Sequence, residues 1–162
     1  MKTLIFLITL ISTTQTLSAA EVDCRQADWS GMVVWAKAFY AKNGTTLAGR
    51  TTQGMPCELN IWPRDEEVFY ISLGTSTNGG TGSGDMNYIG TFINPDSTLS
   101  GICTVKQIEI TPQTAHIHVI QDEVGAPGVV EHDLFIRSDS NGNVTQAQGS
   151  SSYWPSSTCL LN

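Results

Sequence analysis

The fold is decided by Ile102–Arg137, which reads ICTVKQIEITPQTAHIHVIQDEVGAPGVVEHDLFIR. Three runs rich in alternating and β-branched residues are separated here by two short breaks that contain Pro or Gly. Because side chains on a strand point alternately to opposite faces, a period of two predicts strands. The short breaks predict antiparallel neighbours. The three expected strands are Ile102–Ile110, Thr114–Glu123 and Val129–Arg137.

The alternation of the first run assigns its side chains to two faces. One face is expected to carry Ile102, Thr104, Lys106, Ile108 and Ile110, and the other Cys103, Val105, Gln107 and Glu109.

Similar runs lie on both sides of this stretch. They are Glu67–Gly74, Met86–Ile93 and a segment near Val144–Trp154, which follows an Asn141-Gly142 turn. With a front hairpin, the chain predicts an all-β fold, a single antiparallel meander of eight or nine strands. Because an open meander leaves two unpaired edges, we favour an up-and-down barrel over a sandwich.

The segment before these strands allows two interpretations. We prefer Met32–Ala41 as a strand that turns at Asn43-Gly44 and returns through Thr45–Thr52. The alternative is one short N-terminal helix, because apolar residues recur at helical spacing and Gly44 suits the left-handed position after a helix end.

The first twenty residues have the pattern of a secretory signal peptide. A charged start at Lys2 precedes an apolar run from Leu4 to Ile11 and small residues up to Ala20. The apolar run is too short to span a bilayer. We therefore expect a signal peptide over 1–20 and one secreted or periplasmic β-domain over 21–162.

Four cysteines remain in the expected mature chain, at positions 24, 57, 103 and 159. An even number in an exported domain predicts two disulfide bonds and no free thiol. Four cysteines allow three pairings. We prefer Cys24–Cys159 with Cys57–Cys103, which would tie the two ends of the domain together.

Charge excludes some classes of partner. The chain has eight basic and fifteen acidic residues, a formal net charge of −7, and its Lys and Arg residues are scattered. Nucleic acids and anionic lipid surfaces are bound by clustered basic residues. We therefore expect neither as a partner, and no later segment is long and apolar enough to span a membrane.

The histidines are the first candidates for chemistry. His116 and His118 are two positions apart, the spacing that presents two imidazoles on one face of a strand. Aligning the apolar positions of this strand with those of the next places His132 on the opposite face. The three histidines are therefore not expected to form a metal site, and we expect the pair to face solvent.

Two loops resemble calcium-binding sequences but depart from them. Gly79–Asp85 differs from the glycine-rich repeat by an inserted glycine and occurs once. Asp139–Asn143 has oxygen ligands at alternate positions but lacks the required glycine and glutamate of an EF-hand loop. We therefore expect no metal and no cofactor.

Aromatic residues supply the candidate ligand-binding site. Trp62, Tyr153 and Trp154 lie at expected strand ends and offer flat apolar surfaces with a polar group. With no catalytic motif in the sequence, we expect no catalytic residues and a non-enzymatic binding protein. Its partner would be an unknown small ligand, or an extracellular protein that contacts its loops.

Two alternatives stay open. One is an inhibitor of an extracellular enzyme that uses the Gly74–Asp85 loop or the acidic run 65–67. The other is a small hydrolase that uses strand carboxylates, for which Glu58, Glu109, Glu131 and Asp133 are the candidates.

Overall fold

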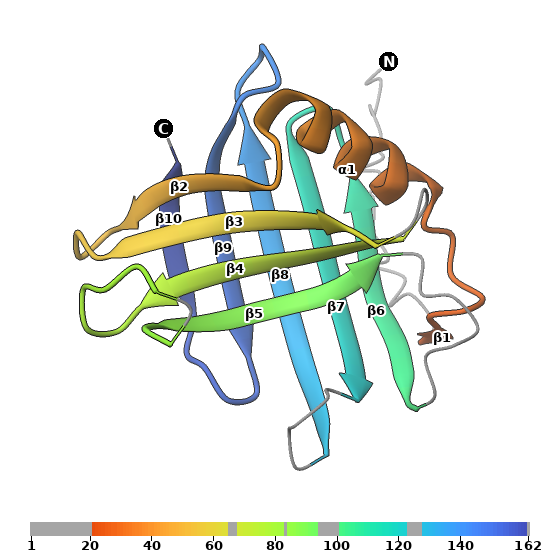
Figure 1. Ribbon diagram of the computed structural model, residues 1–162. Helices are drawn as coiled ribbons and strands as arrows, with labels where there is room; N and C mark the ends of the chain where they lie inside the picture. The colour runs from red at the N-terminus through yellow and green to blue at the C-terminus, as the bar shows by residue number, and fades with distance from the viewer. Residues whose placement is uncertain (1–20, 65–67, 83, 94–100, 123–127, 162) are drawn as a thin grey trace, which may run out of the picture.

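The computed structural model describes residues 21–64, 68–82, 84–93, 101–122 and 128–161. The expected signal peptide lies outside these residues. Within these residues, one antiparallel sheet has the strand order β1-β6-β7-β8-β9-β10-β2-β3-β4-β5, and a single helix accompanies it (Figure 1). The elements are β1 (Val22–Asp23), α1 (Ser30–Asn43), β2 (Thr46–Thr51), β3 (Pro56–Pro63), β4 (Phe69–Ser76), β5 (Met86–Ile93), β6 (Cys103–Ile110), β7 (Thr114–Asp122), β8 (Val129–Ser138), β9 (Val144–Ser151) and β10 (Ser157–Leu161).

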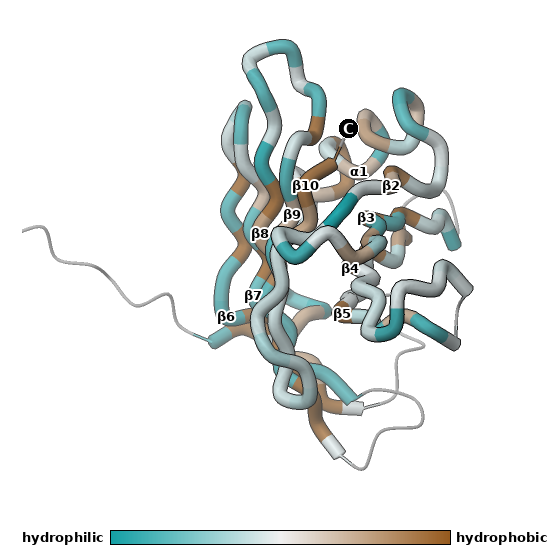
Figure 2. Tube along the Cα trace, turned by 90° about the vertical axis from the view of Figure 1, so that its left-hand side faces the viewer, coloured by the Kyte–Doolittle hydropathy of each residue, from teal (hydrophilic) through white to brown (hydrophobic). Residues whose placement is uncertain are grey.

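The sheet is folded over on itself into two layers. Strands β2–β5 run across the front of β6–β10 in Figure 1, and Figure 2 shows the two layers side by side with α1 at one end between them. The all-β fold with one short helix is confirmed. The barrel preference was wrong, because in the described residues β1 and β5, the two ends of the strand order, do not pair with each other. The chain hides its apolar faces by stacking layers rather than by closure.

The front edge strand, β5, is held by a side chain of the other layer. Gln121 of β7 donates from Nε2 to the carbonyl oxygen of Gly90 (3.2 Å) and accepts from Oγ1 of Thr91 (3.3 Å). Gln121 and Thr91 are buried. A buried carbonyl needs such a partner, so the amide substitutes at this edge for a further strand.

The fold-over occurs at β2, and a disulfide marks it. Strands β3 and β10 both pair with β2, and Cys57 of one is bonded to Cys159 of the other. In a flat sheet, strands two apart would be separated by about 9–10 Å, whereas the Cα atoms of these cysteines are 5.8 Å apart. A Cβ at Gly49 of β2 would lie 2.1 Å from the carbonyl oxygen of Leu160, so only glycine fits in this corner.

The second disulfide joins Cys24 to Cys103 and fastens the N-terminal segment to β6. All four cysteines are therefore bonded, as expected. The preferred pairing was wrong, because it assumed that the two ends of the domain meet. In the fold, the C-terminal strand β10 lies inside the strand order, next to β2, whereas the N-terminal strand β1 pairs with β6 at one end of the order.

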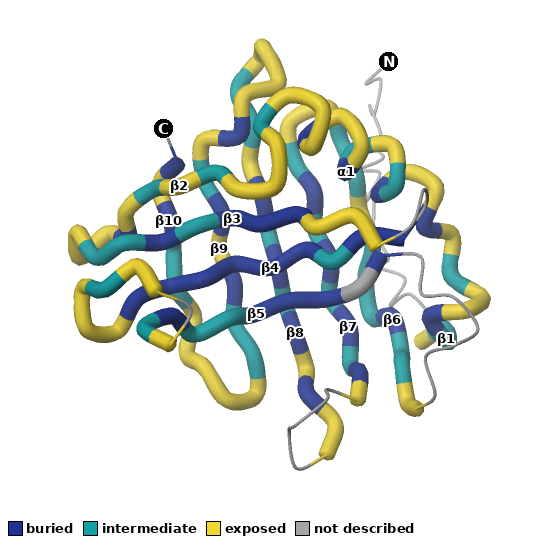
Figure 3. The backbone as a smooth tube through the Cα atoms, viewed as in Figure 1, coloured by how far each residue is buried: buried dark blue, intermediate teal, exposed yellow. Residues whose placement is uncertain are grey.

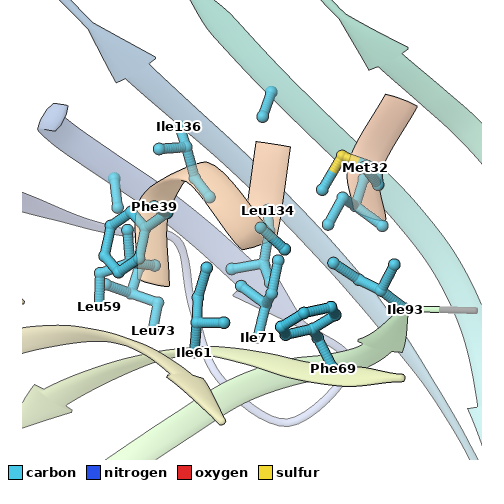
Figure 4. Packing of buried hydrophobic residues seen from close by; sticks show 14 of the residues in the cluster. Met32, Phe39, Leu59, Ile61, Phe69, Ile71, Leu73, Ile93, Leu134 and Ile136 are labelled. Atoms are coloured by element: carbon cyan, nitrogen blue, oxygen red, sulfur yellow. The ribbon is translucent and has the colours of Figure 1, made fainter. Parts of the chain in front are cut away.

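The segment expected as a front strand is the helix α1, so the strand preference was wrong and the helical alternative is confirmed. Met32, Ala36 and Phe39 are buried at helical spacing, whereas Val34 is 69% exposed. Gly44 ends the helix at φ 72° and donates its N–H to the carbonyl of Tyr40. The buried face of the helix packs into the core between the layers (Figure 4).

The core between the layers is aliphatic and aromatic. Leu59, Ile61, Ile71 and Leu73 come from β3 and β4, and they meet Leu134 and Ile136 of β8 (Figure 4). Figure 3 shows β3 and β4 buried through their centres, with exposed turns around them. The interior is therefore filled by side chains at the positions where an internal apolar ligand would lie.

A bulge corrects the faces expected for the first run. The register of β6 against β7 shifts between Val105 and Gln107. As a result Cys103 and Val105 lie on the core side together with Ile108 and Ile110, instead of opposite to them. One extra residue in a strand has this effect because the side-chain period is two.

The other expected runs match strands to within a few residues, but β1, β3 and β10 were not among them, so the described sheet has ten strands instead of eight or nine. Strands β7 and β8 pair as predicted, although the expected turn at 124–128 falls largely outside the described residues. Strands β8 and β9 are joined at Asn141-Gly142, where Gly142 has φ 75°. The Gly74–Asp85 loop is shorter than expected, because β4 continues to Ser76. The acidic run 65–67 lies outside the described residues.

Candidate functional site

The outer face of β7 and β8 carries two imidazole–carboxylate pairs. Both strands alternate between buried and partly exposed residues, and their register places His118 opposite Asp133. His116 and His118 therefore lie on the same face as Glu131 and Asp133. The predicted register is confirmed, and placing these carboxylates outward avoids the free-energy cost of burying them.

Each imidazole is hydrogen-bonded to one carboxylate. Nε2 of His116 donates to Oδ1 of Asp133, and Nε2 of His118 donates to Oε1 of Glu131, both at 2.7 Å. The His116 and His118 side chains are 20% and 28% exposed, and those of Asp133 and Glu131 are 44% and 50% exposed. The pairs hold the carboxylates in place while leaving lone pairs of their oxygens open to solvent.

Two adjoining hollows lie along these pairs, and we call them together the outer groove. The first hollow, of about 220 Å³, and the second, of about 240 Å³, share Asp133 and Ser150. The first is also lined by His118, Glu131, Ser151 and Ser152. The second is also lined by His116, Phe135, Gln148, Gly149 and Ser156.

The charge of the outer groove is acidic. Its described lining residues include Glu131 and Asp133 and no Lys or Arg. Glu109 of β6 lies opposite His116 on the same face. Arg137 is on this face of β8, with its guanidinium 5.2 Å from the ring centroid of Phe135, but does not line the hollows. The groove therefore disfavours anionic ligands.

Two of the predicted ligand-binding residues lie in the turn next to the outer groove, although neither lines a hollow. Tyr153 and Trp154 are 46% and 40% exposed, and they lie between Ser152 and Ser156, which line one hollow each. This turn is fixed to β8, because the Ser152 N–H donates to the carbonyl of Glu131 and the Glu131 N–H donates to Oγ of Ser152.

The third predicted residue, Trp62, lies on the other layer. It is 42% exposed at the end of β3 and stacks on Tyr70 of β4, with ring centroids 5.6 Å apart. In Figure 1, β3 ends on the right, whereas the turn between β9 and β10 lies at the lower left. The structure thus brings Tyr153 and Trp154 together and leaves Trp62 at a different part of the surface.

His132 occupies the inner face of β8 and is 1% exposed. Burial lowers the pKa of its imidazole from 6.5 to about 4, because a charged ring is poorly solvated there. The expected separation of His132 from His116 and His118 is confirmed.

Metal ligands do not gather in the described part of the chain. No group of three or more His, Cys, Asp or Glu side chains there has the arrangement of a metal site. In the turn at Asp139, the carboxylate instead accepts hydrogen bonds from the side chain of Asn143 and from the N–H groups of Asn141 and Asn143. These bonds lower the pKa of Asp139, that from the Asn143 side chain contributing most.

A third hollow, of about 230 Å³, lies between α1 and the β8–β9 turn, where Trp35 and Phe39 form part of its wall. Its cationic group, Lys42, donates to Oδ1 of Asn143. The residues that line this hollow include fewer kinds of polar group than those that line the outer groove. We therefore take the outer groove as the candidate site.

Comparison with protein-family models, curated proteins and solved structures finds no significant match to this chain. None of the helices in the described ranges is long and apolar enough to cross a bilayer.

Sequence reasoning missed the serines and Gln148 of the outer groove. The register of β9 against β8 is the signal that could have found them. Ser150 lies opposite Asp133, and Gln148 lies opposite Phe135. Extending the face assignment from β8 to the next strand would have placed these polar residues beside the imidazole–carboxylate pairs.

Proposed function

We propose that this chain is an exported, non-enzymatic binding protein that holds a hydrophilic, non-anionic ligand in the outer groove. The single observation that carries the proposal is the pair of adjoining hollows, lined by two fixed imidazole–carboxylate pairs and by serine hydroxyls. Such convergent polar groups orient small ligands in binding sites.

Export is the second part of this proposal. It is supported by the charged, apolar and small-residue pattern of positions 1–20 and by the two disulfide bonds. A packed core between the layers favours a ligand on the surface over one carried in the interior.

The test is an amide-resolved NMR screen of the oxidised protein without residues 1–20. The compounds are three matched sets of small molecules: neutral polyols, amines and carboxylates. We expect shift changes at 116–118, 131–135 and 148–154 with polyols or amines, and none there with carboxylates. Changes confined to β3–β4, or binding of carboxylates alone, would contradict the proposal.

The hydrolase alternative has one observation in its favour. Asp133, which accepts a hydrogen bond from His116, lies opposite Ser150 and lines the same hollow. A base, a carboxylate and a hydroxyl in one cleft are the groups that hydrolysis uses. Turnover of nitrophenyl esters or glycosides that disappears in Asp133→Asn would support this alternative over simple binding.

A further inference from the structure

The outer groove has three features that together restrict its ligand. It is acidic, it is elongated along the strands, and an aromatic turn borders it. Each feature excludes some of the ligands that the proposed function allows. The inference rests on that proposed function.

The polar groups of the groove are suited to a ligand with many hydroxyl groups. Each carboxylate accepts one hydrogen bond from its histidine and has further acceptor positions. Ser150 and Gln148 add groups that both donate and accept. A ligand that fills the groove must therefore donate repeatedly and also accept, which hydroxyl groups do.

The groove also extends in one direction. Its lining residues run from Glu131 to Phe135 along β8, a distance of about 13 Å at the usual strand rise. The hollows adjoin along this line because they share Asp133 and Ser150. An elongated ligand with a repeating set of hydroxyl groups fits such a surface better than a single compact molecule does.

The aromatic turn provides the apolar contact. Trp154 and Tyr153 are exposed between two serines that line the hollows, and hydrogen bonds hold their turn against Glu131. Exposed rings on an anchored turn offer flat surfaces for a ligand. An aromatic turn next to the groove and carboxylates held by histidines suit the two kinds of surface of a sugar ring, its C–H face and its hydroxyl edge.

We infer that the outer groove binds a carbohydrate chain of neutral or amino-bearing sugars. Anionic sugars are excluded by Glu131 and Asp133. A polyamine would satisfy the charge of the groove, but it has no acceptor for the donating serine hydroxyls. A basic peptide is tested separately, with tetralysine.

The experiment measures binding to the oxidised protein without residues 1–20 by calorimetry. The probes are pentamers of β-linked glucose, N-acetylglucosamine and glucosamine, with spermine and tetralysine as cationic molecules that are not sugars. The variants are Asp133→Asn, Trp154→Ala and Trp62→Ala. Tyr40→Ala is the matched control, because Tyr40 on α1 is 40% exposed, like Trp154. Thermal unfolding confirms that each variant folds.

We expect at least one sugar pentamer to bind, with affinity reduced about tenfold or more by Asp133→Asn or Trp154→Ala and unchanged by Tyr40→Ala. Sugar binding that is lost in Trp62→Ala and retained in Trp154→Ala would overturn the inference, because the ligand would then lie on the front layer.

Other outcomes separate this inference from the proposed function. Binding of spermine or tetralysine alone, weakened by Asp133→Asn, would overturn the carbohydrate assignment and leave the groove as a binding site. Absence of binding by all five probes would also overturn the carbohydrate assignment, and the NMR screen would then decide independently whether the groove binds anything.

Discussion

The inner and outer faces of β7 and β8 carry the same residue type in opposite surroundings. On the inner face, His132 is buried beside aliphatic neighbours and its pKa is lowered to about 4. On the outer face, His116 and His118 are partly exposed, and each donates a hydrogen bond to a carboxylate. The difference arises from strand alternation, since neighbouring residues point to opposite faces and a shift by one position moves a side chain from one face to the other.

This comparison separates stability from binding. Inner-face residues exclude water and hold the layers together, so their substitution should change the free energy of unfolding. Outer-face residues are held in place but remain hydrated, so their substitution should change ligand binding and leave stability nearly unchanged. Substitutions on the two faces, together with acidification, test this separation.

Leu134→Ala should produce the largest loss of stability. Leu134 is fully buried, and its Cδ2 atom and that of Leu73 approach the same point above Gly149, which places it between the layers. Truncating such a leucine costs about 2–5 kcal/mol, because the cavity collapses only in part. Denaturant unfolding of the oxidised protein measures this loss. A change under about 1 kcal/mol would show that the layers are not packed through Leu134.

Acidification should lower the free energy of unfolding because of His132. Its pKa is lowered in the folded state, so the unfolded state binds the extra proton below the ordinary value of 6.5. The contribution of His132 to the free energy of unfolding is complete above about pH 6.5 and is lost as the pH falls towards 4. The loss approaches about 3 kcal/mol in total, at 1.36 kcal/mol for each pKa unit.

Unfolding free energies measured from pH 7 to pH 4 test this expectation, with His132→Leu as the comparison. The variant should retain only the pH dependence that comes from other groups. Identical slopes for both proteins between pH 6 and 4.5 would exclude His132 as the source.

Gln121→Leu should have an intermediate effect. The substitution keeps a similar volume but removes the hydrogen bonds that Gln121 makes with Gly90 and Thr91. A buried carbonyl left without its partner costs about 1–3 kcal/mol. Hydrogen exchange should also accelerate at β5 more than at β3. If protection of β5 stayed unchanged, the edge would not depend on this amide.

Asp133→Asn should have the smallest effect on folding. The His116–Asp133 pair is partly exposed, and such pairs contribute about 0–1 kcal/mol. The same substitution should weaken carbohydrate binding about tenfold. A loss of stability as large as that of Leu134→Ala would erase the distinction between the two faces.

Much of the candidate site could be predicted from the sequence, because strand alternation is local. The period of two in Thr114–Asp122 and Val129–Ser138 places His116 and His118 on one face and His132 on the other, and the aligned apolar positions fix the register. The exposure of Tyr153 and Trp154 could also be predicted, because they lie at a strand end.

Other features could not be predicted, since they depend on contacts between distant segments. Ser30–Asn43 has a pattern that suits either a strand or a helix, and the open end between the layers favours the helix, which buries Met32, Ala36 and Phe39 there. The bulge between Val105 and Gln107 reverses the face assignment made from local alternation.

The sequence by itself therefore determined the strands of the central stretch, the faces of their histidines and the presence of two disulfide bonds. Only the tertiary structure decided which cysteines pair, where the sheet folds over, and that serines of β9 complete a groove beside the imidazole–carboxylate pairs. The physical reason is range: alternation depends on neighbouring residues along one strand, whereas the corner at β2 and the outer groove depend on how distant strands pack.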